Sequence, residues 1–224
     1  MFIKKEIKIT ADGSTTIHLP DWNENYHSTH GAIQEAKHVF LKYGFDAISK
    51  TEFSILEIGF GTGLNCFLTF LESLKKEKVI HYVGVEAYPV TKEEVSKLNY
   101  VSELKAEKQQ FFFDEMHTCS WEEKNKIYSN FWLTKRKQNF KDISDVNQFN
   151  LIYFDAFGAE HQPELWTVII FKKMFDALKL NGILVTYSAK GSVRRALQEV
   201  GFYVDRLDGP PGKREMLRGT KKIK

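Results

Sequence analysis

Short apolar runs alternate with amphipathic stretches along most of this chain. Buried-strand patterns lie at residues 53–58, 79–85, 151–154 and 183–187, and helical patterns lie at residues 28–44, 64–74, 166–178 and 192–200. This alternation predicts an α/β fold with a doubly wound, mainly parallel sheet. Two more strands, at residues 202–207 and 215–218, flank the turn Gly-Pro-Pro-Gly and predict a C-terminal antiparallel hairpin.

The first fifty residues predict a small β/α appendage. Residues 2–10 alternate as a strand, Asp12-Gly13 forms a hairpin turn, and residues 15–19 supply the returning strand. The helix that follows is expected to start at Ser/Thr caps near Ser28 and to end at Gly44. Its apolar face consists of Ile33, Ala36, Val39 and Phe40. We predict one domain, with this hairpin and helix at residues 1–50 and a cofactor-binding core at residues 51–224.

The middle of the chain has no clean hydrophobic period. Residues 96–108 are expected to be helical, residues 109–134 to form an irregular helix, and residues 131–140 to include a strand. Asn181-Gly182 is expected to stop the helix at residues 166–178, because Asn and Gly terminate helices well.

Composition and charge narrow the class of protein. The chain has 224 residues and a net charge of +3, which allows one full core. Its apolar runs are of strand length and its N-terminus lacks the apolar segment of a signal peptide, so we expect a soluble, cytoplasmic protein with no membrane segment. Cys66 and Cys119 lack metal-type spacing, which indicates neither a zinc site nor a disulfide framework.

Positive charge gathers late in the chain. The late basic residues are Lys190, Arg194, Arg195, Arg206, Lys213, Arg214, Arg218, Lys221, Lys222 and Lys224, and a second cluster consists of Lys124, Lys126, Lys135, Arg136 and Lys137. Such clusters are either solvated faces or contact sites for phosphates, and the pattern alone leaves both interpretations open.

The segment EIGFGTGLN, residues 57–65, predicts a nucleotide site. Ligands of parallel sheets bind beyond the carboxyl ends of the strands, and Gly59, Gly61 and Gly63 lie at such an end. Glu86 ends the next strand, where a carboxylate can bind a ribose diol.

The spacing of these glycines separates two classes of nucleotide. A dinucleotide fingerprint has glycine at its first, third and sixth positions, and the sixth position here is Leu64 or Cys66. Glu57 at the strand end suits an ammonium group and would repel a diphosphate. We therefore predict S-adenosylmethionine as the ligand, with dinucleotide binding and a structural glycine turn as the alternatives.

The segment LIYFDAFGAEHQPELW, residues 151–166, predicts the acceptor site. Asp155 ends a strand in the same crevice and is followed by aromatic residues and a loop that contains proline. A methyl acceptor would be presented to the sulfonium here. The alternative is that Asp155 only caps the following loop.

Three segments together resemble one enzyme family. EIGFGTGLN, YFDAFGAEHQPELW and SAKGSVRRALQEVGFYVDRLDGPPGKREML, with YHSTHGAIQEAKHVFL nearer the N-terminus, are similar to the methyltransferase domain of the bifunctional tRNA 5-methylaminomethyl-2-thiouridine biosynthesis proteins (MnmC). The similarity covers nearly the whole chain, and no second glycine fingerprint follows, so the chain resembles the stand-alone, MnmD-like form. The resemblance implies a Rossmann-like class I fold with S-adenosylmethionine as methyl donor, and neither FAD nor a metal.

The resemblance also implies a reaction and its residues. The reaction is N-methylation of the 5-aminomethyl group of (2-thio)uridine at the tRNA wobble position, giving the 5-methylaminomethyl base. The cofactor-binding residues are then Glu57, Gly59, Gly61, Gly63, Asn65 and Glu86, with Asp142 placed against an adenine-contacting acid of the family. Asp155 matches the acid of the active-site loop, and we expect it to accept a hydrogen bond that orients the amine.

Two sets of residues are expected to contact the tRNA substrate. Tyr153, Phe157 and Trp166 are either base-stacking rings or partial core residues, and Arg194, Arg195, Lys213 and Arg214 are expected to contact phosphates. A separate oxidoreductase chain is a possible partner that would supply the aminomethyl precursor.

Two other functions share these features. A small-amine methyltransferase or an aminopropyltransferase of the polyamine type would use the same loop, but it needs acidic clusters for a polycation, and the late basic excess argues against it. A non-catalytic binding domain would tolerate decay of the loop, but its glycines and both carboxylates are present.

Overall fold

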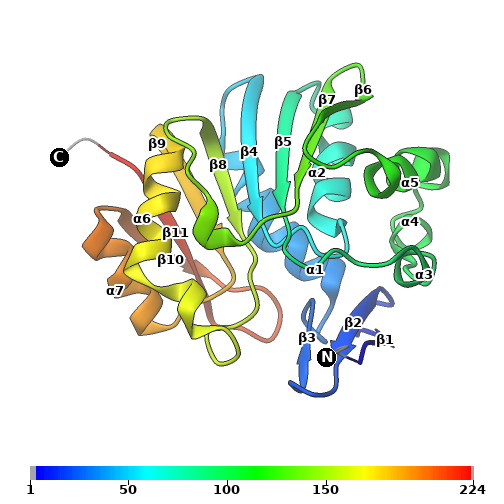
Figure 1. Ribbon diagram of the computed structural model, residues 1–224, viewed down its shortest axis with the longest axis horizontal. Helices are drawn as coiled ribbons and strands as arrows, with labels where there is room; N and C mark the ends of the chain where they lie inside the picture. The colour runs from blue at the N-terminus through cyan, green and yellow to red at the C-terminus, as the bar shows by residue number, and fades with distance from the viewer. Residues whose placement is uncertain (1–3, 223–224) are drawn as a thin grey trace.

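The computed structural model describes residues 4–222 as two sheets with surrounding helices. The large sheet has the order β10-β11-β9-β8-β4-β5-β7-β6, and the small sheet, seen at the bottom of Figure 1, has the order β1-β2-β3. The strands of the large sheet are β4 (Glu52–Ile58), β5 (Val79–Val85), β6 (Lys124–Tyr128), β7 (Phe131–Arg136), β8 (Phe149–Phe154), β9 (Leu178–Thr186), β10 (Tyr203–Asp208) and β11 (Glu215–Thr220). Those of the small sheet are β1 (Glu6–Ile9), β2 (Thr15–Leu19) and β3 (Glu24–Asn25).

The large sheet confirms the predicted doubly wound architecture. β4 pairs in parallel with β5 on one side and with β8 on the other, and β7 and β9 extend the parallel core. The chain leaves β4 toward β5 and returns to its other side at β8, so the order reverses between β4 and β8. Loops that follow strands on both sides of such a reversal diverge and leave a crevice. β10 and β11 add the predicted antiparallel hairpin.

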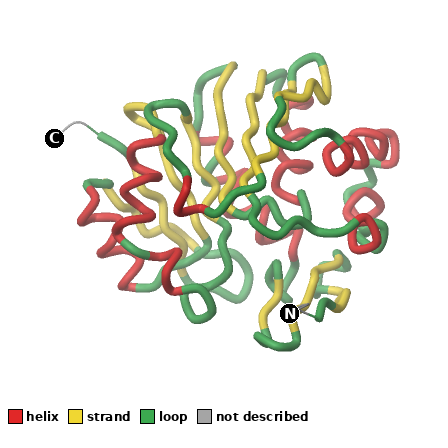
Figure 2. Tube along the Cα trace, in the orientation of Figure 1, coloured by secondary structure: helices red, strands yellow, loops and turns green. Residues whose placement is uncertain are grey.

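Helices cover both faces of the sheet, as the red segments of Figure 2 show. One face packs against the helices α1 (Ala32–Ala36), η1 (Lys37–Lys42), α2 (Leu64–Lys75) and α5 (Gln110–Thr118), and the other against α6 (Val168–Ala177) and α7 (Gly191–Val200). Shorter helical turns are η2 (Phe45–Ala47), α3 (Lys92–Val95), α4 (Tyr100–Glu103), η3 (Glu107–Gln109), η4 (Phe140–Asp142) and η5 (Pro163–Trp166). Among residues 4–222, every helix is too short or too polar to cross a lipid bilayer.

The elements with strong patterns agree with the sequence-based predictions. β2 and β5 have the predicted bounds, and α2 and α7 each differ from them by one residue. The predicted apolar face of the first helix is buried at all four positions. Residues 2 and 3 of the first predicted strand lie outside the described residues; β1 begins at Glu6.

Other elements correct the predictions. The expected irregular helix ends at Thr118, and β6 and β7 then form an antiparallel pair at the sheet edge, where Lys124 and Lys126 lie over the Trp132 ring. The expected helix at residues 96–108 is broken around Asn99, whose side chain bonds the backbone of Thr15 and Gly13 in the small sheet. These are tertiary contacts, which local pattern does not report.

Two predicted helix boundaries are also wrong. Gly31 is the N-cap of α1 and has no side-chain cap, and the Asp12 carboxylate instead accepts the N–H of Gln34 across 2.9 Å. At the other boundary, α6 ends at Ala177, so Asn181-Gly182 lies inside β9, where the pairing with β8 shifts register.

Candidate functional site

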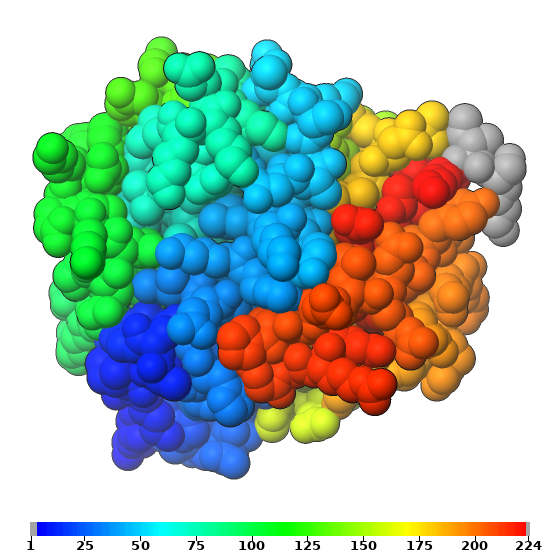
Figure 3. Space-filling view, turned by 180° about the vertical axis from the view of Figure 1, so that it is seen from behind, coloured from blue at the N-terminus to red at the C-terminus, as the bar shows by residue number. Residues whose placement is uncertain are grey.

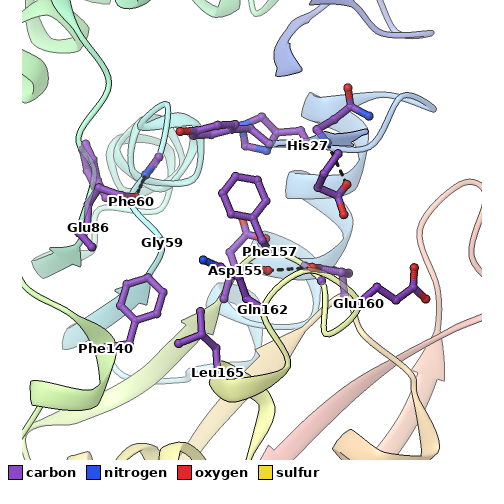
Figure 4. A pocket seen from close by; sticks show the side chains of 18 of the residues that line it. His27, Gly59, Phe60, Glu86, Phe140, Asp155, Phe157, Glu160, Gln162 and Leu165 are labelled. Carbon is purple, nitrogen blue, oxygen red and sulfur yellow. Dashed lines mark hydrogen bonds between the residues drawn. The ribbon is translucent and has the colours of Figure 1, made fainter. Parts of the chain in front are cut away.

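A cavity of about 970 Å³ lies beyond the carboxyl ends of β4, β5 and β8. One end is lined by the glycine loop, Glu86 and Phe140, and the other by Asp155, Phe157 and Gln162 (Figure 4). Its volume is at the upper end of the range for small-molecule sites, and its position is the crevice predicted for a ligand of a parallel sheet.

The glycine loop brings backbone close to Asp155. Gly59, Gly61 and Gly63 all have positive φ, at 90°, 50° and 73°, a conformation that side chains disfavour. A Cβ atom on Gly59 would lie 2.6 Å from the backbone oxygen of Asp155, and one on Gly61 would lie 3.3 Å from the Tyr26 ring. Glycine is therefore required at the first position for the β4 and β8 loops to meet.

Glu86 holds the glycine loop from the end of β5. Its carboxylate accepts the N–H of Gly61 at 3.0 Å and the N–H of Tyr88 at 2.9 Å. The side chain is half-buried and lines the cavity. A carboxylate has about four lone-pair sites, so these two bonds leave acceptor positions for a ligand.

Glu57 does not occupy the position that the sequence predicted. Its side chain is 0% exposed and does not line the cavity, and neither carboxyl oxygen has a hydrogen-bond partner. Burial raises the pKa of Glu57 well above its usual range, which favours the neutral acid. Glu57 is thus a buried group beneath the cavity, and we withdraw its expected role of facing an ammonium group.

Asp155 lies at the end of β8 and faces the cavity. The Asn65 Nδ2 atom donates a hydrogen bond of 2.8 Å to its Oδ2 atom, so Asn65 also lies in the site. Burial and the nearby Glu35 raise the pKa of Asp155 to about 7, against the opposing effects of the Asn65 hydrogen bond and the Lys213 charge. A carboxyl group that titrates near neutral pH can accept a proton and release it again.

The segment between Trp22 and Thr29 forms a wall of the cavity that the sequence analysis missed. The Tyr26 and Trp22 rings meet the Phe157 ring edge-on, with centroids 5.0 Å and 5.8 Å away. His27 bonds Thr62 of the glycine loop at 2.7 Å between Nε2 and Oγ1. Burial lowers the pKa of His27 to about 4, so its imidazole is neutral. The high density of aromatic and polar residues in this segment was the feature of the sequence that could have indicated a binding site.

A second wall joins α1 to the C-terminal hairpin. The Nζ atom of Lys213 lies 2.6 Å from the Glu35 carboxylate and 3.9 Å from the centroid of the Tyr187 ring. In the view from behind, the N-terminal segment (blue) lies beside the hairpin loop (red) (Figure 3). Lys213 is therefore a paired residue inside the cavity, which corrects its expected contact with phosphates. The sequence did not predict Glu35 as a site residue either, because its local pattern is that of an ordinary polar position on a helix.

Two of the predicted aromatic contacts are core residues. Tyr153 is fully buried, with its hydroxyl 3.3 Å from Thr69 Oγ1, and it does not line the cavity. Trp166 is also buried, and its Nε1 atom donates a hydrogen bond of 2.8 Å to the Phe157 carbonyl. Of the three predicted rings, the structure brings Phe157 into the cavity, and Trp166 supports the loop that carries it.

The predicted adenine contact, Asp142, does not line the cavity. It is exposed in η4, and its neighbours Asn139, Phe140 and Lys141 provide the lining instead. Asp142 thus lies beside the residues that line the cavity, and its contact with adenine stays a prediction. Turns bring residues into contact by backbone geometry that spacing alone does not give.

The remaining predicted basic residues lie outside the cavity. Arg195 and Arg214 are exposed, and Arg194 is half-buried on α7. The second basic cluster is not a free basic face, because Lys135 is buried and Arg136 pairs with Asp145 at 2.7 Å. Lys224 lies outside the described residues. Within residues 4–222, no group of three or more metal-binding side chains is found.

Comparison with known sequences gives consistent matches. A family model described as S-adenosyl-L-methionine-dependent methyltransferase matches residues 99–222. The tRNA 5-methylaminomethyl-2-thiouridine biosynthesis bifunctional protein MnmC of Actinobacillus pleuropneumoniae serotype 5b (strain L20) is 28% identical, over 89% of this chain and 33% of the relative. The protein of the same name from Leptospira interrogans serovar copenhageni (strain Fiocruz L1-130) is 30% identical, over 89% and 33%. The chain spans about a third of the length of these relatives.

A solved structure shares the fold over the whole chain. The crystal structure of MNMC2 from Aquifex aeolicus superposes with a TM-score of 0.77 at 23% identity, covering 100% of this chain and 73% of that one. Spermidine synthase from Thermotoga maritima superposes with a TM-score of 0.51 at 14% identity, covering 99% and 73%. These likenesses confirm the predicted Rossmann-like fold.

Proposed function

Because this chain belongs to the family of S-adenosyl-L-methionine-dependent methyltransferases, we propose that it methylates the 5-aminomethyl group of (2-thio)uridine at the tRNA wobble position. The observation that carries the proposal is that one cavity joins the glycine loop to Asp155, a carboxyl group with a pKa near 7. The names of the relatives support the choice of a tRNA 5-methylaminomethyl-2-thiouridine product.

The residues of the cavity fit S-adenosylmethionine. A side chain at Gly61 would project from a strained backbone next to Tyr26. Glycine therefore leaves the backbone of this loop accessible to a nucleoside. Glu86 retains acceptor positions for a ribose diol, and Phe140 and Tyr88, which also line the cavity, offer apolar surface for a base. When bound there, the cofactor would supply a methyl group on a sulfonium centre.

Asp155 would position the acceptor amine and take its proton. An alkyl ammonium has a pKa of about 10.4, so most of it is protonated at neutral pH and lacks a free lone pair. The ionised carboxylate of Asp155 would attract this cation, accept its N–H bond and direct the nitrogen across the cavity. Phe157 and Tyr26 offer ring faces and edges beside it for a nucleobase.

The tRNA itself would extend beyond the cavity. Arg195 and Arg214 are exposed cations available to phosphates, and Lys190 lies at the rim, paired with Glu160 at 2.6 Å. We include in the proposal a cytoplasmic site of action and an oxidoreductase on a separate chain that makes the aminomethyl precursor. The proposed reaction requires neither FAD nor a metal.

One observation favours the alternative of a small-amine methyltransferase or aminopropyltransferase. Acidic residues outnumber lysines in the cavity wall; the acids are Glu24, Glu35, Glu86, Asp155, Glu160 and Glu164, and the lysines are Lys141, Lys190 and Lys213. A free diamine would suit this charge. However, three of the acids are already paired, with His161, Lys213 and Lys190, so the surplus is smaller than the count indicates.

A single assay separates these functions. The protein is incubated with methyl-labelled S-adenosylmethionine and either tRNA that carries the 5-aminomethyl base or a linear diamine. We expect label in the wobble nucleoside, identified by mass, and none in the diamine, with Asp155→Asn as the control that binds cofactor without transfer. Label in the diamine alone would replace the proposal with a small-amine methyltransferase. An aminopropyltransferase, tested with the decarboxylated donor, would instead leave the label on the methylthioether leaving group and add an aminopropyl group to the mass of the diamine.

A further inference from the structure

The acceptor end of the cavity contains a partly buried ion pair. The Glu35 Oε1 atom lies 2.6 Å from Lys213 Nζ, and its Oε2 atom accepts the N–H of Ser28 at 3.0 Å. Glu35 is 8% exposed, and both residues line the same cavity as Asp155. Charges in such a setting act on each other more strongly than exposed charges do, because water and salt screen them less.

Lys213 is also coupled to the loop that carries Asp155. Its ammonium group lies 3.9 Å from the centroid of the Tyr187 ring, and the Tyr187 hydroxyl donates a hydrogen bond of 2.8 Å to the carbonyl of Ala156. Ala156 follows Asp155 in the chain. The cation is therefore linked to this loop through Tyr187, by two contacts in series.

We propose that Lys213 and Glu35 are positioning residues that act on Asp155 in opposite directions. Lys213 stabilises the carboxylate of Asp155, and Glu35 holds Lys213 in place while it favours the neutral acid. The catalytic consequence rests on the proposed function, but the electrostatic relationship does not require any substrate.

The surroundings of Asp155 support this assignment. The pKa of its carboxyl group is raised by burial and by Glu35, and is lowered by the Asn65 hydrogen bond and by Lys213. From the elements packed around it, the charges of Glu57 and Tyr187 would also act on Asp155, and burial raises the pKa of both, which favours their neutral forms.

Four other titratable groups in or beside the cavity wall pair with one another. Lys190 contacts Glu160 at 2.6 Å, and His161 contacts Glu24 at 3.1 Å. Glu164 also lines the cavity, but the charges that act on Asp155 are those of Glu35 and Lys213.

This balance matters for a group that exchanges protons with an amine. A carboxyl group that stays neutral at working pH cannot attract an ammonium ion or take its proton. One that ionises far below working pH is a weak acceptor, so an intermediate pKa is favourable. Burial has the largest effect and raises the pKa of Asp155; Glu35 raises it further, and Lys213 lowers it, so the two charges adjust the pKa in opposite directions.

The test is a direct titration of Asp155 in the whole protein. Protein labelled with ¹³C at aspartate carboxyl groups is titrated by NMR, and the Asp155 signal is identified by its loss in Asp155→Asn. We expect Lys213→Met to raise the titration midpoint and Glu35→Gln to lower it, each by about 0.5–1.5 pH units, with the double variant between them. Lys190→Met removes a lysine from an ion pair of the same length in the cavity wall, and it should leave the midpoint unchanged.

Midpoints that do not move, or that move in the same direction in both variants, would overturn the proposal. Lys213→Arg retains the charge and should restore the wild-type midpoint, which a loss of packing alone would not explain. If Lys213→Met does not fold, Lys213→Gln takes its place beside Glu35→Gln. Because no tRNA is present, the result stands even if the proposed substrate is wrong; the acid limb of the methylation rate should shift equally only if both proposals hold.

Discussion

Asn65 donates a hydrogen bond of 2.8 Å to the Asp155 carboxylate, so the helix that follows the glycine loop holds the carboxylate at the end of the neighbouring strand. Asn65 is also the second residue of α2, which starts at Leu64, directly after the glycine loop that a nucleoside would approach. The two halves of the cavity are thereby connected through one side-chain amide.

Replacement of Asn65 should impair catalysis more than cofactor binding. Asn65→Ala removes a donor to a charged group, a bond worth about 1.5–3 kcal/mol, so we expect the methylation rate at pH 7 to fall by about 10-fold to 100-fold. Single-turnover kinetics at saturating cofactor measures this loss. An equal loss in the Asp155→Asn background would show that Asn65 acts independently of Asp155.

Glu86 should contribute to cofactor affinity through its remaining acceptor positions. We expect Glu86→Ala to weaken S-adenosylmethionine binding by about 1–3 kcal/mol and Glu86→Gln to weaken it less, since an amide oxygen can still accept the N–H of Gly61. Calorimetric titration gives both affinities. Glu72→Ala on the outer part of α2 is a suitable control, and unchanged affinity in a folded Glu86→Ala variant would remove Glu86 from the site.

Asp155→Asn should separate binding from chemistry. The amide retains the shape of the carboxyl group but cannot take a proton, so we expect S-adenosylmethionine to bind normally and the methylation rate to fall by about 10²–10⁴-fold. In the wild-type enzyme the rate should rise with pH around a midpoint near 7. A near-wild-type rate in the variant would assign proton acceptance to another group.

The same variant should change how stability depends on pH. The folded pKa of Asp155, about 7, lies above its ordinary value of 3.8, so the folded state binds the proton more tightly than the unfolded state. The stabilisation from this group is fully present below about pH 4 and is lost as the pH rises through about 7.

The Asp155→Asn variant cannot lose this stabilisation as the pH rises, because its amide does not titrate. Relative to wild type, its free energy of unfolding should therefore gain about 1–3 kcal/mol between pH 4 and pH 8, a range discounted because Asp155 is only half-buried. Urea unfolding at the two pH values measures the difference, and an equal pH dependence in both proteins would contradict the raised pKa.

Exposed arginines should carry the tRNA contact that Lys213 cannot. We expect the double variant Arg195→Ala/Arg214→Ala to weaken tRNA binding and to lower the slope of log affinity against log salt by about 0.7–0.9 for each lost contact. Filter binding across a salt series measures this. Arg218→Ala is the control, because Arg218 pairs with Asp205 at 3.1 Å; a slope that falls equally in both would indicate a general charge effect.

The regular elements were predictable because their signals are local. The period of β5, the glycines after β4 and the acid after β8 each depend on a few neighbouring positions. Parallel strands then bring Gly59 and Asp155 together by rule, since the carboxyl ends of β4 and β8 lie side by side.

The rest of the site was not predictable in this way. Glu35 and Tyr26 belong to segments whose local pattern is that of a helix face and a loop, and only the folding of residues 22–36 over the cavity gives them a role. The predictions for Lys213 and Glu57 failed for the opposite reason. Each residue has a plausible role in its local sequence, but Lys213 pairs with Glu35 in the fold, and Glu57 is buried.

The Glu35–Lys213 pair joins positions 178 residues apart, and this separation bears on the order in which the protein is built. During synthesis the chain emerges from its N-terminal end, and contacts between distant positions form after local ones. The glycine loop and its neighbours can therefore assemble while Lys213 has yet to be added. A nascent chain would acquire its cofactor end first and its complete acceptor end only after Lys213 has been added, so partly made protein would hold a methyl donor without a finished place for the nucleoside that receives it.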